Sequence, residues 1–311
     1  MIPAYNCAES IRHAINSVLQ QSVAVSEIVI VDDGSKDDTQ QVVKELATQH
    51  PIVKVIVQAN GGPGKARNTG IQNASGHWIA FLDSDDQWLP DRIEKQHQLI
   101  ESSDIDLAWV GGRFVKITQH DNVIGNSPIA SDIANQSSSV HPALELLAGS
   151  TSFWTGCFLG KKSAVKAVGG FCESMRTGED ADLWERLALQ YPIVGFVKEP
   201  IARYVVAQNS SLTGAAARKI SPSQYHHYER LIGYINDTPD KKSKVLLRRI
   251  LQSKIDGCMK GFVRSGSLKQ ARLYTKELAS RGFPSPDWKF RALILLPEWP
   301  IKLLRQLLGK G

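Results

Sequence analysis

Carboxylates gather at two places in the first hundred residues, each directly after an apolar run. The run WIAFL is followed by DSDD, which contains Asp83, Asp85 and Asp86. The run IVIV is followed by Asp32 and Asp33. Like charges repel one another, and burial strengthens that repulsion. A divalent cation would relieve it, and carboxylate oxygens suit Mg²⁺ or Mn²⁺, whose remaining ligands come from water and substrate phosphates.

The DSDD stretch also has a purely structural interpretation. It could form an Asx-rich turn before a helix whose first turn contains Pro90 and Asp91. If the two apolar runs are strands of an open parallel sheet, however, their carboxyl ends face one crevice, where such sheets bind ligands. The second acidic strand end therefore favours a cation site that holds a diphosphate.

Two other phosphate-binding patterns do not fit. A P-loop needs glycine five residues before its Gly-Lys pair and serine or threonine after it, but ANGGPGKAR has Ala59 and Ala66 at these positions. The fingerprint G-x-G-x-x-G is absent after the first strand, where PAYNCAES stands. An NAD-dependent enzyme is therefore not expected.

The elements that must position these residues follow from the hydrophobic pattern. Apolar residues recur at helical spacing in CAESIRHAINSVLQQ, whereas EIVIVD is a short β-branched run typical of a strand. The alternation continues with a helix, a strand, a helix and a strand at residues 37–49, 52–57, 65–74 and 77–83. This order predicts an α/β fold with a mostly parallel central sheet flanked by helices.

Charge is unevenly distributed along the chain. The 311 residues carry a formal net charge of +6, yet residues 1–237 contain 20 basic and 26 acidic side chains, against 17 and 5 in residues 238–311. From about residue 221 the pattern is mostly helical. We therefore predict an α/β domain of residues 1–217 and a helical, basic C-terminal region of residues 218–311.

The composition, with 42% hydrophobic and 22% charged residues, is that of an ordinary soluble globular protein. Cys7, Cys157, Cys172 and Cys258 lack the spacing of a zinc site or a disulfide framework, which suits a reducing cytoplasm. No apolar stretch reaches the ~18 residues that could span a bilayer, and no signal peptide precedes the first motif. We therefore expect a cytoplasmic location.

Four blocks of sequence together resemble family 2 glycosyltransferases, which have the GT-A fold. They are IPAYNCAESIRHAINSVLQQS, EIVIVDDGSKDDT, NGGPGKARNTGIQNASGHWIAFLDSDDQWLPDRIEKQ and GGFCESMRTGEDADLWERLA, within residues 2–205. The resemblance implies an enzyme that transfers a sugar, with inversion, from a nucleotide-sugar to a saccharide or lipid-linked acceptor. UDP is the expected nucleotide, and bacterial surface polysaccharide biosynthesis is the expected setting.

The resemblance also implies roles for individual residues. Asp180 matches the catalytic base, and Asp32 matches the position that binds the uracil edge. Asp83 and Asp85 match the D-x-D motif, with Asp86 as a further metal ligand, so Mg²⁺ or Mn²⁺ is the expected cofactor. The residues expected to bind the nucleotide-sugar are Pro3, Ala4, Tyr5, Asn6, Glu9, Asp32, Asp33, Gly62, Lys65, Arg67, Asn68, Asp83, Ser84 and Glu179.

These residue types suit sugar transfer. An acceptor hydroxyl is a poor nucleophile, so a carboxylate must take its proton during attack, and a single displacement gives inversion. The local sequence supports a structural role for Asp180 equally well, since Thr177-x-x-Asp180 has the pattern of a helix capping box. Glu179 could likewise be a solvated charge at a helix start, and Lys65 and Arg67 could lie on an exposed helix face.

Two departures from the family pattern bear on activity. Met1 stands where the family has a longer first strand, so we expect that the assigned start is too late. Many relatives carry Arg and His after the last strand, where this chain has Val205 and Ala207. A side chain that could touch the metal or the diphosphate is thus missing, and Ser210, Ser211 or nearby backbone would have to replace it.

The C-terminal residues 287–311 mix aromatic, leucine and basic side chains and contain Pro297 and Pro300. They could lie on the inner face of the cytoplasmic membrane or pack as a helical bundle with a solvated basic face. Nucleic acid is not an expected partner, because the aromatics cluster with leucines. An alternative function stays open: a catalytically silent nucleotide-sugar or glycan-binding subunit of a membrane-associated complex.

Overall fold

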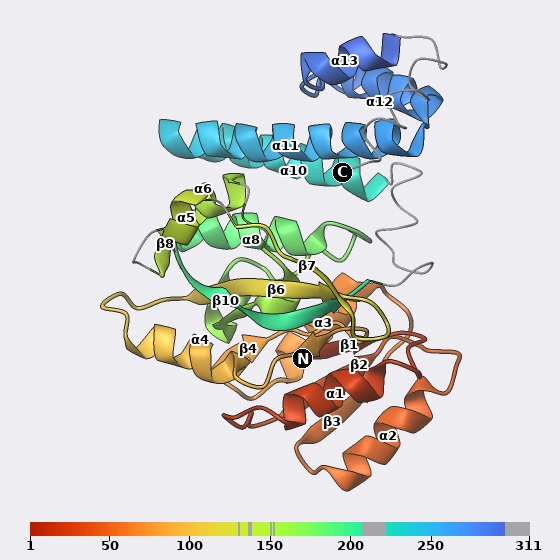
Figure 1. The fold of residues 1–311 in the computed structure, drawn as a ribbon, viewed down its shortest axis with the longest axis vertical. Helices are drawn as coiled ribbons and strands as arrows, with labels where there is room; N and C mark the ends of the chain where they lie inside the picture. The colour runs from red at the N-terminus through yellow and green to blue at the C-terminus, as the bar shows by residue number, and fades with distance from the viewer. Residues whose placement is uncertain (130, 136–138, 150, 152, 207–221, 296–311) are drawn as a thin grey trace. The chain divides into compact units, whose positions relative to one another are not determined.

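The computed structural model describes residues 1–129, 131–135, 139–149, 151, 153–206 and 222–295 (Figure 1). By its internal contacts the chain divides into a first unit, Met1–Ala207, and a second unit, Gln208–Gly311. The domain boundary predicted between residues 217 and 218 lies outside the described residues.

A parallel three-stranded sheet forms the N-terminal part of the first unit. Its strands, in spatial order, are β1 (Ile2–Ala4), β2 (Ile28–Asp32) and β3 (Val53–Val57). The helices that alternate with them are α1 (Ile11–Leu19), α2 (Thr39–Gln49) and α3 (Pro63–Asn73). Every residue of β2 is buried, as its unbroken β-branched run predicts.

The backbone of Met1 joins this sheet to the next one. Its nitrogen donates to the carbonyl of Ala80 at 2.8 Å, and its carbonyl accepts from the N–H of Leu82 at 3.1 Å, in the pattern of a parallel pair. The carboxyl ends of β2 and of β4 (Trp78–Ala80) therefore lie at the same end of the strands, on either side of β1.

The second sheet is mixed. In its centre β6 (Trp109–Ile117) and β10 (Ile193–Val205) run parallel, whereas its other strand pairs are antiparallel. These other strands are β4, β5 (Gln87–Trp88), β7 (Val123–Asn126), β8 (Val140–Pro142) and β9 (Leu159–Lys161). The α/β fold class with helices around a central sheet is confirmed. Whether these short strands pair in a parallel or an antiparallel direction was not predictable, because the sequence of a strand of two to four residues does not encode its direction.

The remaining helices of the first unit pack around this second sheet (Figure 1). They are α4 (Arg92–Glu101), α5 (Ser131–Asn135), α6 (Ala143–Ala148), the short 3₁₀ helix η1 (Thr155–Cys157), α7 (Lys162–Ala167) and α8 (Glu179–Gln190). Stacked aromatic rings hold α8 in place, with Trp184 at 4.4 Å from Phe158 and 6.4 Å from Trp109 between ring centroids.

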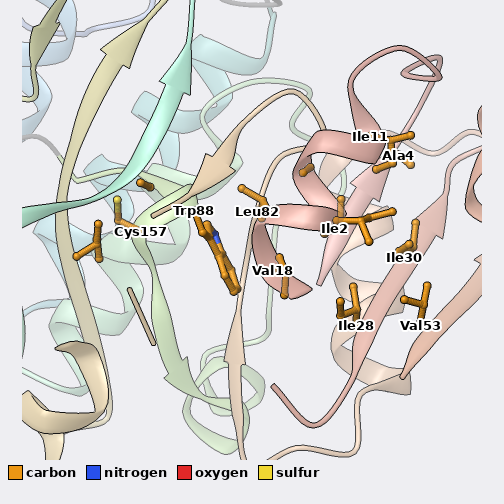
Figure 2. Packing of buried hydrophobic residues seen from close by; sticks show 14 of the residues in the cluster. Ile2, Ala4, Ile11, Val18, Ile28, Ile30, Val53, Leu82, Trp88 and Cys157 are labelled. Atoms are coloured by element: carbon orange, nitrogen blue, oxygen red, sulfur yellow. The ribbon is translucent and has the colours of Figure 1, made fainter. Parts of the chain in front are cut away.

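One hydrophobic core extends across both sheets (Figure 2). It runs from Val53 of β3, through Ile30 and Ile2, to Trp88 of the second sheet and Cys157 of η1 (Figure 2). This continuous packing fixes the two acidic strand ends relative to each other.

The second unit is helical, as expected for the C-terminal region. Its helices are α10 (Pro222–Asp237), α11 (Lys241–Ser265), α12 (Leu268–Ser280) and α13 (Trp288–Leu295). In its interior the hydroxyls of Tyr228 and Tyr274 lie 2.9 Å apart. Across the described parts of the chain, the structure contains no helix with the length and apolar character to cross a membrane. Trp288 is 65% exposed, and residues 296–311 of the C-terminal tail, for which a membrane contact and a helical bundle were both considered, lie outside the described residues.

Candidate active site

A buried arginine connects the acidic end of β4 with the start of α8. Arg67, on α3, is 5% exposed. Its Nη2 donates to Asp83 Oδ1 at 2.6 Å, and its Nη1 donates to Glu179 Oε1 at 2.7 Å. Its guanidinium also lies over the ring of Phe171, 5.2 Å from the centroid. The exposed helix face considered for Arg67 is therefore wrong, and the solvated charge considered for Glu179 is wrong as well, because Glu179 is buried.

The charges in this ion-pair network depend on one another. Burial would lower the pKa of Arg67, but the carboxylates of Asp83 and Glu179 raise it above its ordinary value. Burial raises the pKa of Glu179, and the positive charge of Arg67 opposes that effect. Removing one partner would leave a buried charge without compensation, which is the costly way to break such a pair.

Asp180, the predicted base, lies beside this network with a donor on each carboxylate oxygen. Its Oδ1 accepts from the N–H of Ala181 at 2.7 Å, and its Oδ2 accepts from the hydroxyl of Thr155 at 3.0 Å. A carboxylate oxygen has two acceptor sites, so each oxygen keeps one for a further hydrogen bond. Asp180 is half-buried, and its neighbour Glu179 forms the ion pair with Arg67.

The start of α8 differs from the capping box considered from the sequence. The helix begins at Glu179 and has Gly178 at its N-cap, with φ 80° and no side-chain capping hydrogen bond. Glycine adopts this positive φ without strain, so the chain can turn directly into the helix. Asp180 stands in the first turn, where the helix dipole favours a negative charge.

The three aspartates of the DSDD stretch have different environments. Asp83 is paired with Arg67, Asp85 is exposed, and Asp86 is 2% exposed and accepts from the N–H of Val205 at 2.7 Å. Desolvation, followed by the charge of Asp83, raises the pKa of Asp85 to about 6. Because Asp85 is exposed, solvent screening moderates this effect. Desolvation also raises the pKa of Asp86 well above its ordinary value.

Asp83 is half-buried and Asp85 is exposed, whereas Asp86 is buried, so the first two are the more accessible candidates for holding a divalent cation. Arg67 contacts one oxygen of Asp83, and the exposed Asp85 follows two positions later. Asp86 ties its loop to β10 through Val205, which favours a structural role, and its expected role as a further metal ligand stays a prediction. In the described part of the chain, no three His, Cys, Asp or Glu side chains are grouped to hold a metal. Two carboxylates suffice for Mg²⁺ or Mn²⁺ when substrate phosphates and water complete the shell.

The second acidic strand end holds the loop that precedes α3. Asp33 accepts from the N–H of Gly61 at 2.8 Å, from the N–H of Gly62 at 2.7 Å and from Nε2 of Gln58 at 2.7 Å. Gly62 is the N-cap of α3, and Arg67 lies further along the same helix. Both acidic strand ends therefore anchor α3. In the described part of the chain, the hydrogen bonds that the Asp33 side chain accepts all come from this loop, while its expected contact with the nucleotide-sugar stays a prediction.

Asp32 is buried at the end of β2. Its Oδ2 accepts from Nε2 of Gln40 at 2.8 Å, and both of its oxygens lie 3.3 Å from the N–H of Ser35. These contacts fix the orientation of the carboxylate that the family resemblance assigns to the uracil edge.

The loop after β1 packs against the loop after β2. Asn6, with φ 48°, donates its N–H to Ser35 Oγ at 3.0 Å, and its Oδ1 accepts from the N–H of Lys36 at 2.8 Å. Asn tolerates this left-handed conformation better than most residues. Of the other residues expected here, Tyr5 and Glu9 are exposed, Pro3 is half-buried and Ala4 is buried.

The remaining residues expected at the donor site are Lys65, Asn68 and Ser84, and they differ in exposure and in their contacts within the fold. Lys65 is exposed on the first turn of α3. Asn68 is a clamp within the fold: its Nδ2 donates to the carbonyl of Phe171 at 2.9 Å, and its Oδ1 accepts from the N–H of the same residue at 2.8 Å. Ser84 is half-buried near Cys7: burial raises the pKa of the Cys7 thiol, and Ser84 opposes this effect.

Three residues near the site were not indicated by the sequence. Thr155 contacts Asp180, and Gln40 contacts Asp32. Arg176 lies against Gly62, where a Cβ atom would be 3.1 Å from Nη1 of that arginine. None of the three belongs to a motif with a fixed spacing. Of the departures noted after the last strand, Val205 contributes its N–H to Asp86, while Ala207, Ser210 and Ser211 lie outside the described residues.

Comparison with known proteins identifies the family. The model of "Glycosyl transferase family 2" matches residues 1–169, more than half of the chain. The chain belongs to glycosyl transferase family 2. The matched part contains both acidic strand ends and Arg67, whereas Glu179 and Asp180 lie beyond it.

Relatives in this family match different lengths of the chain. An uncharacterized glycosyltransferase of Nostoc is 44% identical over 106 residues, which are 34% of this chain and 33% of that protein. Chondroitin synthase of Escherichia coli is 29% identical over 231 residues, 73% of this chain and 31% of that protein. The chain thus spans about a third of the length of these two relatives. An uncharacterized glycosyltransferase of Rickettsia typhi is 26% identical over 276 residues, 88% of this chain and 82% of that protein.

Solved structures share the fold. TarS of Staphylococcus aureus in complex with UDP has a TM-score of 0.65 and 18% identity, over 85% of this chain and 73% of that one. A mannosyltransferase of Pyrobaculum calidifontis in complex with GDP-Man and Mn²⁺ has a TM-score of 0.58, over 98% of this chain and 81% of that one. These likenesses confirm the GT-A fold that the family resemblance implied.

Proposed function

We propose that this protein is an inverting, metal-dependent glycosyltransferase. It transfers a sugar from a UDP-linked donor to a saccharide or lipid-linked acceptor, in bacterial surface polysaccharide biosynthesis. The observation that carries the proposal is the double ion pair of Arg67 with Asp83 and Glu179. This double ion pair brings Asp83, a candidate ligand of the metal that binds the diphosphate, close to the helix turn that contains Asp180.

Asp180 is the catalytic base in this proposal. A base must lie within reach of the acceptor hydroxyl and have a free acceptor site. Asp180 is half-buried at the start of α8, and each carboxylate oxygen has one donor and one remaining site. As the hydroxyl attacks the anomeric carbon, its proton passes to Asp180 and the bond to the nucleoside diphosphate breaks.

Asp83 and Asp85 would hold the divalent cation. When bound, Mg²⁺ or Mn²⁺ stabilises the negative charge that grows on the leaving diphosphate. Arg67 keeps Asp83 in a defined orientation from the protein side. Asp32 and the exposed Tyr5 and Lys65 are the candidates for contacts with the nucleotide.

Solved structures of the same fold support a nucleotide-sugar donor: TarS is bound to UDP and to UDP-GlcNAc, and the mannosyltransferase is bound to GDP-Man. Chondroitin synthase of Escherichia coli and hyaluronan synthase of Pasteurella multocida are relatives whose names support a saccharide product. A peripheral membrane contact through the basic C-terminal region would suit a lipid-linked acceptor.

The test is release of nucleoside diphosphate from a panel of UDP-sugars and GDP-mannose, with Mn²⁺, with Mg²⁺ and with EDTA. Asp180→Asn should retain donor binding and lose transfer by about 10²-fold or more. Asp83→Asn should weaken donor and metal binding together. Asp104→Asn, at an exposed acid of the same unit, is the matched control and should behave as the wild type.

Two results would contradict the proposal. Transfer that survives both EDTA and Asp83→Asn would exclude the metal site, and full transfer by Asp180→Asn would exclude the base. Donor binding without turnover on any acceptor would favour the silent binding subunit instead.

A further inference from the structure

The segment η1 is held in place by two buried polar side chains of α4. Nη2 of Arg92 donates to the carbonyl of Phe158 at 2.7 Å, and Nε2 of Gln96 donates to the carbonyl of Cys157 at 2.8 Å. Nε of Arg92 also donates to Oε1 of Gln96 at 3.2 Å, and both side chains are fully buried. Shifting η1 would leave these groups without partners inside the protein, which is unfavourable.

Arg92 also connects η1 to the acidic stretch. Its guanidinium stacks on the ring of Trp88 with 3.8 Å to the centroid. Trp88 forms β5, directly after the DSDD stretch, and β5 pairs with β10. The buried guanidinium of Arg92 thus contacts both the segment that follows the DSDD stretch and the segment that follows η1.

Thr155 extends this support to the base. Its side chain is not accessible to a substrate, since the residue is 1% exposed. Its hydroxyl donates to Oδ2 of Asp180, while the N–H of Ala181 holds Oδ1. Donors on both oxygens define the plane of the carboxylate. Without Thr155, Asp180 could rotate toward the positive charge of Arg67, which lies close enough to interact with it.

We infer that Thr155 is a positioning residue for Asp180, which it holds in the orientation needed to accept the proton of an acceptor hydroxyl. This inference rests on the proposed role of Asp180 as the base. The hydroxyl of Thr155 acts through Asp180 and does not touch donor, acceptor or metal. A small misorientation of a catalytic group lowers the rate of the chemical step, while donor binding is unaffected.

The test compares Thr155→Ser with Thr155→Ala in the full chain. Both variants lose the methyl group, and they differ only in the hydroxyl. We expect Thr155→Ser to retain kcat within about threefold and Thr155→Ala to lose about tenfold or more in kcat, with the KM for the donor unchanged in both. Thr275→Val, which removes a threonine hydroxyl on α12 far along the chain, is a control that should leave kcat and KM unchanged.

A double-mutant cycle separates positioning from a general structural effect. In the Asp180→Asn background the Thr155→Ala change should have little further effect on the residual rate, because the group that Thr155 positions is already lost. Thermal denaturation of each variant shows whether it is folded at the assay temperature. If Thr155→Ala is not folded there, Gln96→Met, which loosens η1 from the other side, replaces it with the same expected fall in kcat.

The outcomes distinguish this inference from the proposed function. If Asp180→Asn is fully active, the proposed base is wrong. If Asp180→Asn is inactive while Thr155→Ala and Thr155→Ser have equal kcat, only the role of Thr155 is wrong. An equal loss from Thr155→Ala in the wild-type and Asp180→Asn backgrounds would also overturn it.

Discussion

Nη1 of Arg67 and Oε1 of Glu179 lie 2.7 Å apart, although 112 positions separate the two residues in the chain. The other terminal nitrogen of Arg67 is bound to Asp83. One buried guanidinium thus determines the relative position of the candidate metal site and the helix that bears Asp180.

Arg67→Met should therefore destabilise the protein strongly. It leaves the carboxylates of Asp83 and Glu179 close together without a cation, and breaking a buried pair costs about 3–5 kcal/mol. Urea denaturation measures the free energy of unfolding. Arg12→Met is the matched control, because Arg12 pairs with Glu45 on the surface, where such pairs contribute about 1 kcal/mol or less. Equal losses in the two variants would contradict a structural role for the Arg67 network.

Glu27→Gln should lose an acid-sensitive part of the stability. Desolvation opposes ionisation of Glu27, but hydrogen bonds from Lys54, Ser75 and Gly76 lower its pKa from 4.5 to about 2. The folded-state pKa is depressed, so this stabilisation is fully present above pH 4.5 and is lost as the pH falls toward about 2. Near pH 7 the wild type should exceed Glu27→Gln by on the order of 2 kcal/mol. Denaturant titrations at several pH values measure this, and a difference that is independent of pH would refute it.

Asp85→Asn should change the metal requirement of transfer, whereas Asp86→Ala should lower the stability of the protein. Asp85 is exposed and a candidate metal ligand, so its replacement should raise the Mn²⁺ concentration needed for half-maximal transfer by about tenfold, with little change in stability. Asp86 holds the N–H of Val205, so its replacement should cost about 1–3 kcal/mol of stability. Metal titration of transfer and thermal denaturation separate the two effects. If Asp86→Ala raised the Mn²⁺ requirement and left stability intact, it would be a ligand after all.

The basic second unit should bind anionic vesicles in a salt-dependent way. Lys289 and Arg291 lie on α13 beside the exposed Trp288, and all three are exposed. Replacing both basic residues by Glu should reduce co-sedimentation with phosphatidylglycerol vesicles severalfold, because each basic group near such a surface contributes about 1 kcal/mol.

The control for this experiment is Lys44→Glu with Lys166→Glu, which changes the charge equally at exposed positions of the first unit. Vesicle binding that is unaffected by salt and by the α13 variant would argue for the solvated helical bundle considered from the sequence.

The sequence by itself determined the architecture of the first unit and its chemistry. The β-branched runs around Ile30 and Val55 identify strands, and the acidic residues that follow the run around Ile30 and the run WIAFL mark carboxyl ends where α/β sheets bind ligands. The order of the motifs indicated the family. The pattern from about residue 221 predicted helices, and the charge count of residues 238–311 predicted that this region is basic.

Only the tertiary structure decided which carboxylates are free and which are committed. Asp85 and Asp86 are adjacent in sequence, yet one is exposed and the other is buried against Val205, because the chain turns between them and β10 covers only the second. Asp32 and Asp33 likewise look equivalent, but Asp33 holds the loop before α3. The partners of Arg67 and the contact of Thr155 with Asp180 join segments far apart in the chain. No local period or spacing encodes such contacts, since they depend on how the core packs the two sheets together.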